Sequence, residues 1–217
     1  MTISDTLADP RVESALDRLF ARAEEDDVVA ARLRAEQLEG FGGTPQEYAD
    51  ALAEIYMPIS RTGGELLYNL VRATRPATVV EFGMSYGIST LYLAAAVRDN
   101  GTGRVLTTEL SQEKIAAARR TFAETGLADL ITVLEGDARM TLAGIEADFV
   151  LLDGWKNLCL PVLKLLEPKL RPGTLVVVDD VVLDDLQPYL AYVRDPANGY
   201  RSVTFPVEDG MEISCRL

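Results

Sequence analysis

Histidine is absent from the 217 residues of this chain. Its absence removes the commonest general base and the commonest ligand of transition metals. Acid–base chemistry must then use lysine, aspartate, glutamate or tyrosine, and a metal site must be built from oxygen ligands. Cysteine is scarce as well, since Cys159 and Cys215 are the only two. They match neither a disulfide framework nor the C-x-x-C spacing of a zinc or redox site, so we expect two small buried hydrophobic residues.

Basic residues are outnumbered, with 21 Lys and Arg against 34 Asp and Glu and a formal charge of −13. The chain has no basic stripe for a phosphate backbone, and anionic headgroups would repel it, so we expect neither nucleic acid nor membrane as a partner. No apolar run is long enough to cross a bilayer, and the N-terminus lacks the basic and apolar regions of a signal peptide. We therefore expect a cytoplasmic protein that binds a small-molecule substrate.

The length and the 48% of hydrophobic residues suit a single α/β domain, residues 1–217, with a helical N-terminal extension. Residues 9–39 have helical periodicity with a break near 24–27, and glycines at 40, 42 and 43 end it. Thr44-Pro45-Gln46-Glu47 has the form of a capping box and predicts a helix to about residue 55, and a further helix is expected from residue 63 or 64 to about 74. Residues 1–75 are thus expected to form a helical cover. The apolar faces of residues 9–39 could cover the active site or a second subunit, which makes a homodimer possible.

Residues 76–217 alternate short apolar strands with helices, which predicts a Rossmann-like, doubly wound core. Near-continuous apolar runs such as TLVVV and FVLL indicate strands buried on both faces, as in a mostly parallel sheet covered by helices. The segments between the first five strands have roughly the length of right-handed crossovers. Only a short turn separates the last two strands, so we expect them to pair in antiparallel fashion. The seven expected strands are residues 78–82, 104–108, 131–134, 148–152, 174–178, 201–205 and 211–215.

Three motifs follow successive strands at the edge where doubly wound sheets bind ligands. Gly83 and Gly87 follow the first strand and would let the backbone turn sharply close to a ligand. Glu109 ends the second strand, 26 residues after Gly83 (109 − 83), where a carboxylate can accept both hydroxyl groups of a ribose. Gly136-Asp137-Ala138 follows the third strand and could flank an adenine. Together they predict a nucleoside cofactor, and the absence of a full G-x-G-x-x-G pattern weakens the case for a pyrophosphate.

Carboxylates also end the fourth and fifth strands, with Asp153 after one and Asp179 and Asp180 after the other. If these strands are neighbours, the three side chains converge and repel one another unless a cation balances them. A hard divalent ion such as Mg²⁺ takes oxygen ligands of this kind. Lys156 follows Asp153 on the same edge and could remove a proton from a substrate hydroxyl, provided that its pKa is lowered.

These residues resemble a known family. Asp153-Gly154-Trp155-Lys156 followed by RPGTLVVVDDV is similar to catechol O-methyltransferase and its bacterial small-molecule relatives, within the class I S-adenosylmethionine-dependent O-methyltransferases. EFGMSYGISTLYLA is similar to the family's first cofactor motif, and residues 57–64 are similar to its segment that lies along the methionine part of the cofactor. The resemblance covers about residues 55–216, and D-x-W-K is its most specific element.

The resemblance implies an S-adenosylmethionine-dependent O-methyltransferase that uses Mg²⁺ or another divalent cation and methylates a hydroxyl of a small, catechol-like aromatic substrate. It implies that Asp153, Asp179 and Asp180 hold the metal and that Lys156 deprotonates the substrate. The residues implied at the cofactor are Ile59, Glu81, Gly83, Tyr86 and Ser89 at the methionine end, Glu109 at the ribose, Leu110, Ala138 and Trp155 at the adenine, and Asp153.

Two positions depart from the family pattern. Asp179-Asp180 replaces the usual Asp-Asn, which makes the expected metal site more negative. Val203 stands near the family's acid that binds the second catechol hydroxyl, and valine cannot form that hydrogen bond. The resemblance therefore implies methyl transfer more strongly than it implies catechol.

Three alternatives remain open from the residues alone. The first is a metal-independent methyltransferase of another small molecule. The second is a nicotinamide-dependent oxidoreductase, which would share Glu109 but expects the missing third glycine. The third is a non-catalytic nucleoside-binding protein of the same fold, against which the presence of all three carboxylates and Lys156 argues.

Overall fold

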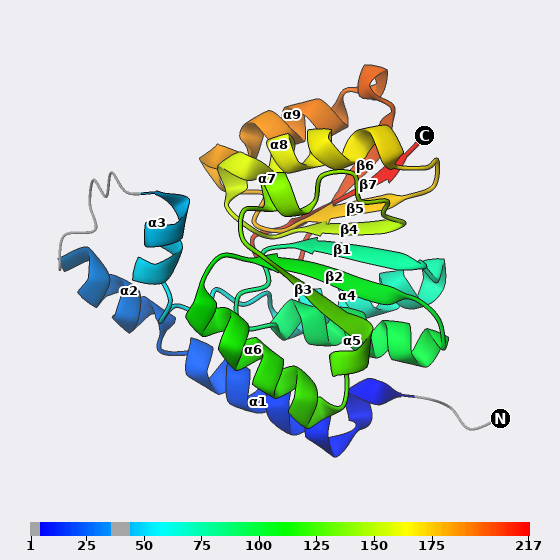
Figure 1. Cartoon of the computed structure of the whole chain (residues 1–217). Helices are drawn as coiled ribbons and strands as arrows, with labels where there is room; N and C mark the ends of the chain where they lie inside the picture. Colours follow the sequence, from blue (N-terminus) through cyan, green and yellow to red (C-terminus); the bar gives the residue numbers. More distant parts are fainter. Residues whose placement is uncertain (1–4, 36–43) are drawn as a thin grey trace.

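A seven-stranded sheet forms the centre of the molecule in the computed structural model, which describes residues 5–35 and 44–217 (Figure 1). The strand order is β3-β2-β1-β4-β5-β7-β6. Strands β1 to β5 are parallel, and β7 is antiparallel to both β5 and β6. This arrangement confirms the mostly parallel, Rossmann-like sheet with an antiparallel C-terminal pair.

Every expected strand is present, and each end lies within one residue of its predicted position. The strands are β1 Thr78–Phe82, β2 Arg104–Glu109, β3 Ile131–Glu135, β4 Phe149–Leu152, β5 Leu175–Val178, β6 Tyr200–Phe205 and β7 Met211–Arg216. The crossover from β3 to β4 differs from the prediction, because its helix has only four residues. Gly144 has a φ of 77° shortly after that helix, a conformation that ends helices and favours glycine.

Four helices precede the sheet, and five lie within or beside it. They are α1 Pro10–Ala23, α2 Asp26–Ala35, α3 Pro45–Ala51, α4 Arg61–Thr74, α5 Ile88–Asn100, α6 Gln112–Thr125, α7 Ala138–Thr141, α8 Lys156–Leu166 and α9 Gln187–Arg194. The predicted break near 24–27 is confirmed between α1 and α2. The capping box of α3 is also confirmed, with Thr44 and Glu47 each accepting a hydrogen bond from the other's backbone N–H. The glycines at 40, 42 and 43 lie outside the described residues.

Two helix boundaries were predicted wrongly. Helix α3 ends at Ala51, four residues short of the expected end. Helix α4 begins at Arg61 rather than at residue 63 or 64, because the Ser60 hydroxyl caps it by accepting a hydrogen bond from the Gly63 N–H at 2.9 Å. Glycine at these positions has a packing role instead, since a Cβ on Gly64 would lie 2.3 Å from the ring of Tyr92.

Helices cover both faces of the sheet, as doubly wound folds require. Figure 1 shows α1, α4, α5 and α6 on one face, and α7, α8 and α9 on the other. The first face buries α1 and α5 completely at Val12 and Leu91, and the second buries α8 at Val162 and Leu163. Of the two cysteines, Cys159 is buried as expected, whereas Cys215 is only partly buried because it lies on β7 close to the C-terminus.

The order of the strands reverses between β1 and β4, which is where a doubly wound sheet leaves a crevice for ligands. The carboxyl ends of β1, β2, β4 and β5 meet at this edge. Helix α3 lies outside the sheet beside the same edge (Figure 1). Among the helices of the described ranges, none combines the length and the apolar character needed to span a bilayer.

Candidate active site

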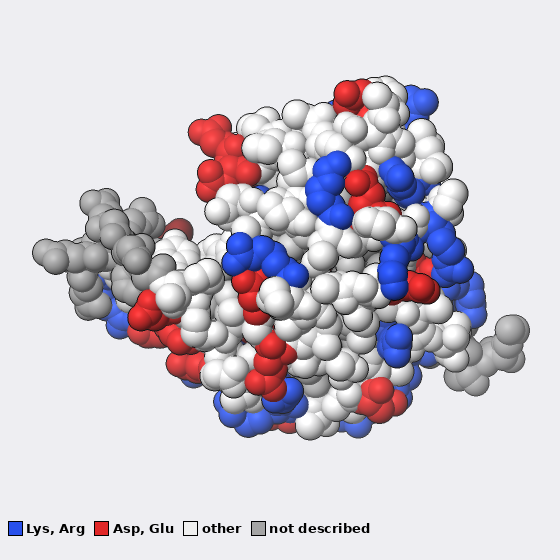
Figure 2. Space-filling view, turned by 45° about the horizontal axis from the view of Figure 1, so that its top comes forward, with Lys and Arg blue, Asp and Glu red and all other residues white. Residues whose placement is uncertain are grey.

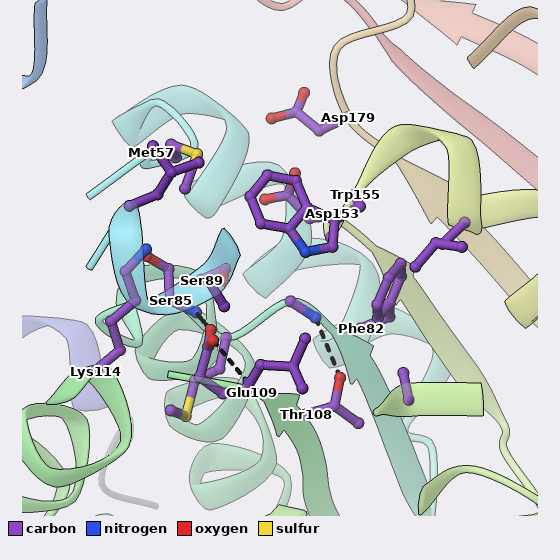
Figure 3. A pocket seen from close by; sticks show the side chains of 18 of the residues that line it. Met57, Phe82, Ser85, Ser89, Thr108, Glu109, Lys114, Asp153, Trp155 and Asp179 are labelled. Atoms are coloured by element: carbon purple, nitrogen blue, oxygen red, sulfur yellow. Dashed lines mark hydrogen bonds between the residues drawn. The ribbon is translucent and has the colours of Figure 1, made fainter. Parts of the chain in front are cut away.

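A pocket of about 410 Å³ lies at the carboxyl edge of the sheet. This volume is within the range of roughly 300–1,000 Å³ that is usual for small-molecule sites. The expected site residues that line it are Ile59, Gly83, Tyr86, Ser89, Glu109, Leu110, Ala138, Asp153, Trp155, Lys156, Asp179 and Asp180. Figure 3 shows several of these side chains converging from the turn after β1 and from the ends of β2, β4 and β5. The topology thus brings together residues that are far apart in the sequence.

Glu81 is the expected cofactor residue that does not line the pocket. Its side chain lies in the middle of the sheet and is fully buried. Hydroxyl groups of Ser89, Thr90 and Thr107 donate hydrogen bonds to its carboxylate, at 2.6 Å from Ser89 Oγ. Burial raises the pKa of Glu81 to about 7, although these hydroxyl groups act in the opposite direction. Glu81 is thus linked to the pocket through Ser89, which lines it.

The glycines in the turn after β1 allow a sharp bend and close packing within the protein. Gly83 has a φ of 98°, which confirms the sharp turn. A Cβ on Gly83 would lie 2.6 Å from the backbone of Gly154, and one on Gly87 would lie 2.7 Å from the ring of Phe122. The space beside these glycines is thus filled by other parts of the protein. The close approach of Gly83 to Gly154 holds the loop after β4 against the turn after β1.

Glu109 lies at the end of β2 with its carboxylate fixed by backbone groups. The N–H groups of Ser85, Leu110 and Ser111 donate hydrogen bonds to it at 2.8, 2.8 and 2.9 Å (Figure 3). Ser85 is held in the left-handed region with a φ of 49°, and its hydroxyl donates to the backbone oxygen of Tyr56 at 2.6 Å. The Glu109 side chain is therefore oriented before any ligand binds, at the edge where a ribose is expected.

Asp153, Asp179 and Asp180 form the carboxylate cluster that the strand order predicts. One oxygen from each lies within 4.8 Å of the others. Burial raises the pKa of Asp153 even though Lys156 acts against the shift. Burial, together with repulsion from the other two carboxylates, raises the pKa of Asp179 to about 7. The cluster has more negative charge than its surroundings balance, and its donors are the hard oxygens that Mg²⁺ and Ca²⁺ prefer.

Lys156 lies between two of these carboxylates. Its ammonium group is 2.8 Å from Asp153 Oδ1 and 2.9 Å from Asp180 Oδ2. Burial acts to lower its pKa, but the attraction of Asp153 and Asp180 is stronger, and the net effect is a raised pKa. The role of Lys156 as a base requires a lowered pKa, and these contacts do not provide it without a metal ion. Lys156 is a bound cation here, and it becomes a proton acceptor only when another positive charge balances the carboxylates.

The helical N-terminus contributes directly to the pocket. Pro45 and Ala49 of α3 line it, and the ring of Tyr48 lies 4.9 Å from that of Trp155. The side-chain amide of Gln46 donates a hydrogen bond to the backbone oxygen of Leu110 at 2.9 Å. Helix α3 therefore covers one side of the pocket.

Lys114 is a pocket residue that the sequence analysis missed. It lies in the first turn of α6, is 4% exposed, and lines the pocket on the side of Tyr86. A cation in the first turn of a helix is unfavourable against the helix dipole, and this was the signal available in the sequence. Val203, by contrast, is 61% exposed on edge strand β6 and does not line the pocket.

Charges of both signs are interleaved over the surface. Figure 2 shows acidic and basic side chains scattered among neutral residues, with no continuous basic band on the coloured part of this face. Several form exposed ion pairs, such as Arg98 with Asp129 and Arg18 with Glu124. This face offers no extended track for a phosphate backbone.

Comparisons with known proteins agree with this geometry. A family model for a methyltransferase domain matches residues 80–181. The chain is 30% identical to catechol O-methyltransferase B of Danio rerio, over 95% of this chain and 84% of that protein. It is 29% identical to the catechol O-methyltransferase of Mycobacterium tuberculosis, over 80% of this chain and 72% of that protein.

Solved structures share the fold along most of the chain. Cofactor-bound Rv0187 from MTB superposes with a TM-score of 0.68 at 25% identity, over 87% of this chain and 95% of that one. The O-methyltransferase TomG from Streptomyces achromogenes, in complex with SAM, has a TM-score of 0.66 at 22% identity, over 91% of this chain and 98% of that one. These matches decide against the nicotinamide-dependent oxidoreductase. With the strand order and the pocket, they show that the chain is an S-adenosylmethionine-dependent O-methyltransferase and belongs to the class I family that includes catechol O-methyltransferase.

Proposed function

We propose that this O-methyltransferase methylates a hydroxyl group of a small, catechol-like substrate and that a divalent cation, Mg²⁺ above all, takes part. The observation that carries the proposal is the placement of Asp153, Asp179, Asp180 and Lys156 in the pocket that Glu109 also lines. A nucleoside-binding end and a carboxylate-rich end thus share one cavity.

The carboxylate cluster fits a divalent cation by its chemistry. Three oxygen donors come from the ends of neighbouring strands. Burial raises the pKa of Asp179, and repulsion from Asp153 and Asp180 adds to the effect. Asp180 has a φ of 62°, a left-handed conformation that costs about 1–2 kcal/mol for a residue other than glycine. When bound, a divalent cation would polarise substrate oxygens and make a hydroxyl more acidic.

Lys156 is the residue that we assign to accept the proton of the substrate hydroxyl. Its Nζ lies at the rim of the pocket, where Asp153 and Asp180 orient it. It must lose its own proton first, so this role requires that the two carboxylates be balanced by a charge other than its ammonium group. Its stem is largely buried, which limits the positions that Nζ can take.

The remaining pocket residues suit the cofactor in the expected order. We assign Glu109 to the ribose because its carboxylate is already fixed by three backbone N–H groups. The other assignments are Leu110, Ala138 and Trp155 at the adenine, and Ile59, Gly83, Tyr86, Ser89 and Asp153 at the methionine end. Glu81 is assigned a positioning role through Ser89.

A flat substrate suits the outer part of the pocket. Trp155 lines the pocket and packs against Tyr48 of α3, and Met57 and Leu183 add apolar surface. We further propose that residues 1–217 act as one methyltransferase domain, in which residues 1–75 cover the site. Buried side chains of α1, such as Leu16, pack into the same core as α5 and support this assignment.

The test is methyl transfer from labelled S-adenosylmethionine to matched aromatic substrates in the presence of Mg²⁺. Compounds with two neighbouring hydroxyl groups should be methylated, while the corresponding single-hydroxyl phenols should react at least tenfold more slowly, because one oxygen cannot occupy two positions of a metal template. Equal rates for both series would contradict the catechol-like assignment. Mass spectrometry of the products identifies the methylated oxygen.

A further inference from the structure

Lys114 is a buried cation without a counter-ion among residues 5–35 and 44–217. The residue is 4% exposed, and its ammonium group lies 5.7 Å from the centre of the Tyr86 ring. Within residues 5–35 and 44–217 it has no salt-bridge partner. Taking an ammonium group out of water without a partner is costly, so such a group is kept where something else pairs with it.

The acids around Lys114 are engaged elsewhere. Glu109 accepts backbone hydrogen bonds from Ser85, Leu110 and Ser111. Asp26 accepts from the backbone N–H groups of Tyr56 and Met57, at 2.9 and 2.7 Å. With Glu113, these acids favour the charged form of Lys114, yet burial outweighs them and lowers its pKa. These acids thus attract the ammonium group from a distance, and none of those in the described part of the chain forms an ion pair with it.

The side chain points into the pocket. Figure 3 shows Lys114 rising from α6 toward Ser85 and Met57, on the far side of the cavity from Asp153 and Asp179. An anion beside Lys114 would therefore be separated from the carboxylate cluster, which would repel it.

We propose that Lys114 binds the carboxylate of the methionine part of the cofactor. This inference rests on the assignment of the pocket to S-adenosylmethionine. The cofactor has one anionic group, its carboxylate, whereas its ammonium and sulfonium groups are cationic and its adenosine is neutral. An unpaired ammonium group attracts the carboxylate, repels the ammonium and sulfonium groups, and gains little from the neutral adenosine. Lys114 thereby selects ligands that have the amino acid part.

The experiment compares two ligands by titration calorimetry, S-adenosylhomocysteine and 5′-methylthioadenosine, which lacks the amino acid part. Replacement of Lys114 with Met (Lys114→Met) should weaken the first by about tenfold to a hundredfold, the usual range for one charge-assisted hydrogen bond. It should change the affinity for the second by less than about twofold. Lys114→Arg keeps the charge and should retain most of the selectivity.

Thermal unfolding without ligand gives an independent readout. Because Lys114→Met removes a buried and unpaired charge, its Tm should equal or exceed that of the wild type. A Tm that falls by several degrees would contradict the proposal, since it would mean that Lys114 has a structural partner in the free protein. Equal weakening of both ligands, or unchanged binding of S-adenosylhomocysteine, would overturn it as well. If wild-type protein fails to bind S-adenosylhomocysteine, this result contradicts the cofactor assignment itself, and with it the role of Lys114.

Discussion

At the scale of single residues, charge balance at the pocket rim decides what Lys156 can do. Its ammonium group bridges Asp153 and Asp180 and stabilises their negative charge. The same contacts raise its pKa and oppose deprotonation. A catalytic role for Lys156 is thus tied to the charge state of the carboxylates.

Replacing Lys156 with Met (Lys156→Met) should lower kcat by about a hundredfold or more, the usual contribution of a positioned acid–base group. Binding of S-adenosylhomocysteine should change by less than about twofold, because the nucleoside contacts remain. Lys164→Met, in an exposed lysine of the same helix, is the matched control and should leave kcat near that of the wild type. A variant that loses cofactor binding and keeps its kcat would contradict the assignment.

Glu81 gives a prediction about stability and pH. Its pKa is raised from 4.5 to about 7 in the folded protein by burial. A raised carboxyl pKa contributes stability that is complete below the unfolded-state value and is lost as the pH rises through the folded-state value. Ionisation of Glu81 should therefore reduce stability between about pH 4.5 and pH 7 by about 3 kcal/mol, at 1.36 kcal/mol per unit.

Thermal unfolding of Glu81→Gln at pH 5 and pH 8 tests this effect. The variant should gain on the wild type as the pH rises, because glutamine has no charge to bury. Glu146→Gln, at a strongly exposed side chain, is the control and should show no such change. A difference from the wild type that is the same at both pH values would show that Glu81 does not titrate in this range.

Sequence reasoning located the residues at strand ends and missed those that depend on burial. Glu109, Asp153 and Asp179 follow apolar strands, so the rule for doubly wound sheets placed them at one edge. Glu81 has the same sequence neighbourhood as a ligand-binding residue, and only the three-dimensional structure shows its carboxylate enclosed by hydroxyl groups. Lys114 is one of three basic residues on helix α6, and its lack of an ion-pair partner among the described residues is visible only in the folded molecule.

At the scale of elements, the turn between β1 and α5 packs closely against the loop after β4. Alanine at position 83 would have to adopt the positive φ of 98°, and its Cβ would lie 2.6 Å from the Gly154 backbone. Gly101→Ala is a matched control, because its φ is 68° and a Cβ there meets nothing within 4 Å. The control should cost about 1 kcal/mol from its backbone alone, and Gly83→Ala at least about 3 kcal/mol, as measured by urea unfolding. Equal losses would show that the close approach to Gly154 is easily relieved.

The neighbouring strands β4 and β5 are the elements that create the carboxylate cluster, and Mg²⁺ should stabilise the folded protein through them. At 100 times its Kd, a ligand adds about 2.7 kcal/mol, which corresponds to roughly 5–10 °C in Tm for a chain of this size. Asp179→Asn should lose most of this shift, whereas Asp129→Asn, at an exposed salt bridge, should retain it. An undiminished shift in Asp179→Asn would place Mg²⁺ elsewhere on the acidic surface.

Element boundaries were predictable where a local signal defines them. The capping box of α3 and the break between α1 and α2 appear directly in the residue types. The start of α4 was misplaced because Gly63 and Gly64 look like helix breakers, although Ser60 caps the helix before them. The length of α7 could not be inferred, since turn and irregular chain at residues 142–148 complete the crossover after β3.

At the scale of the whole molecule, residues from distant parts of the chain meet in the pocket at one edge of the sheet. Pocket residues run from Pro45 to Leu183, and the helical N-terminus closes one side through α3. The predicted strand order made this gathering foreseeable, whereas the contact between Tyr48 and Trp155 depends on how the helices pack. The homodimer stays a prediction, and sedimentation equilibrium of the full chain would decide it.

The most direct test of metal-assisted methyl transfer is an assay of wild-type protein with labelled S-adenosylmethionine and a vicinal aromatic diol, run in Mg²⁺, in EDTA, and in EDTA followed by excess Mg²⁺. We expect methylated product with Mg²⁺, at least a hundredfold less product in EDTA, and recovery when Mg²⁺ is restored. The reason is that a Mg²⁺ ion held by the carboxylate cluster would balance the negative charge that Lys156 balances without it, and would polarise the substrate oxygens. An equal rate in EDTA would contradict the metal site and would favour a metal-independent methyltransferase in which Lys156 remains the partner of Asp153 and Asp180.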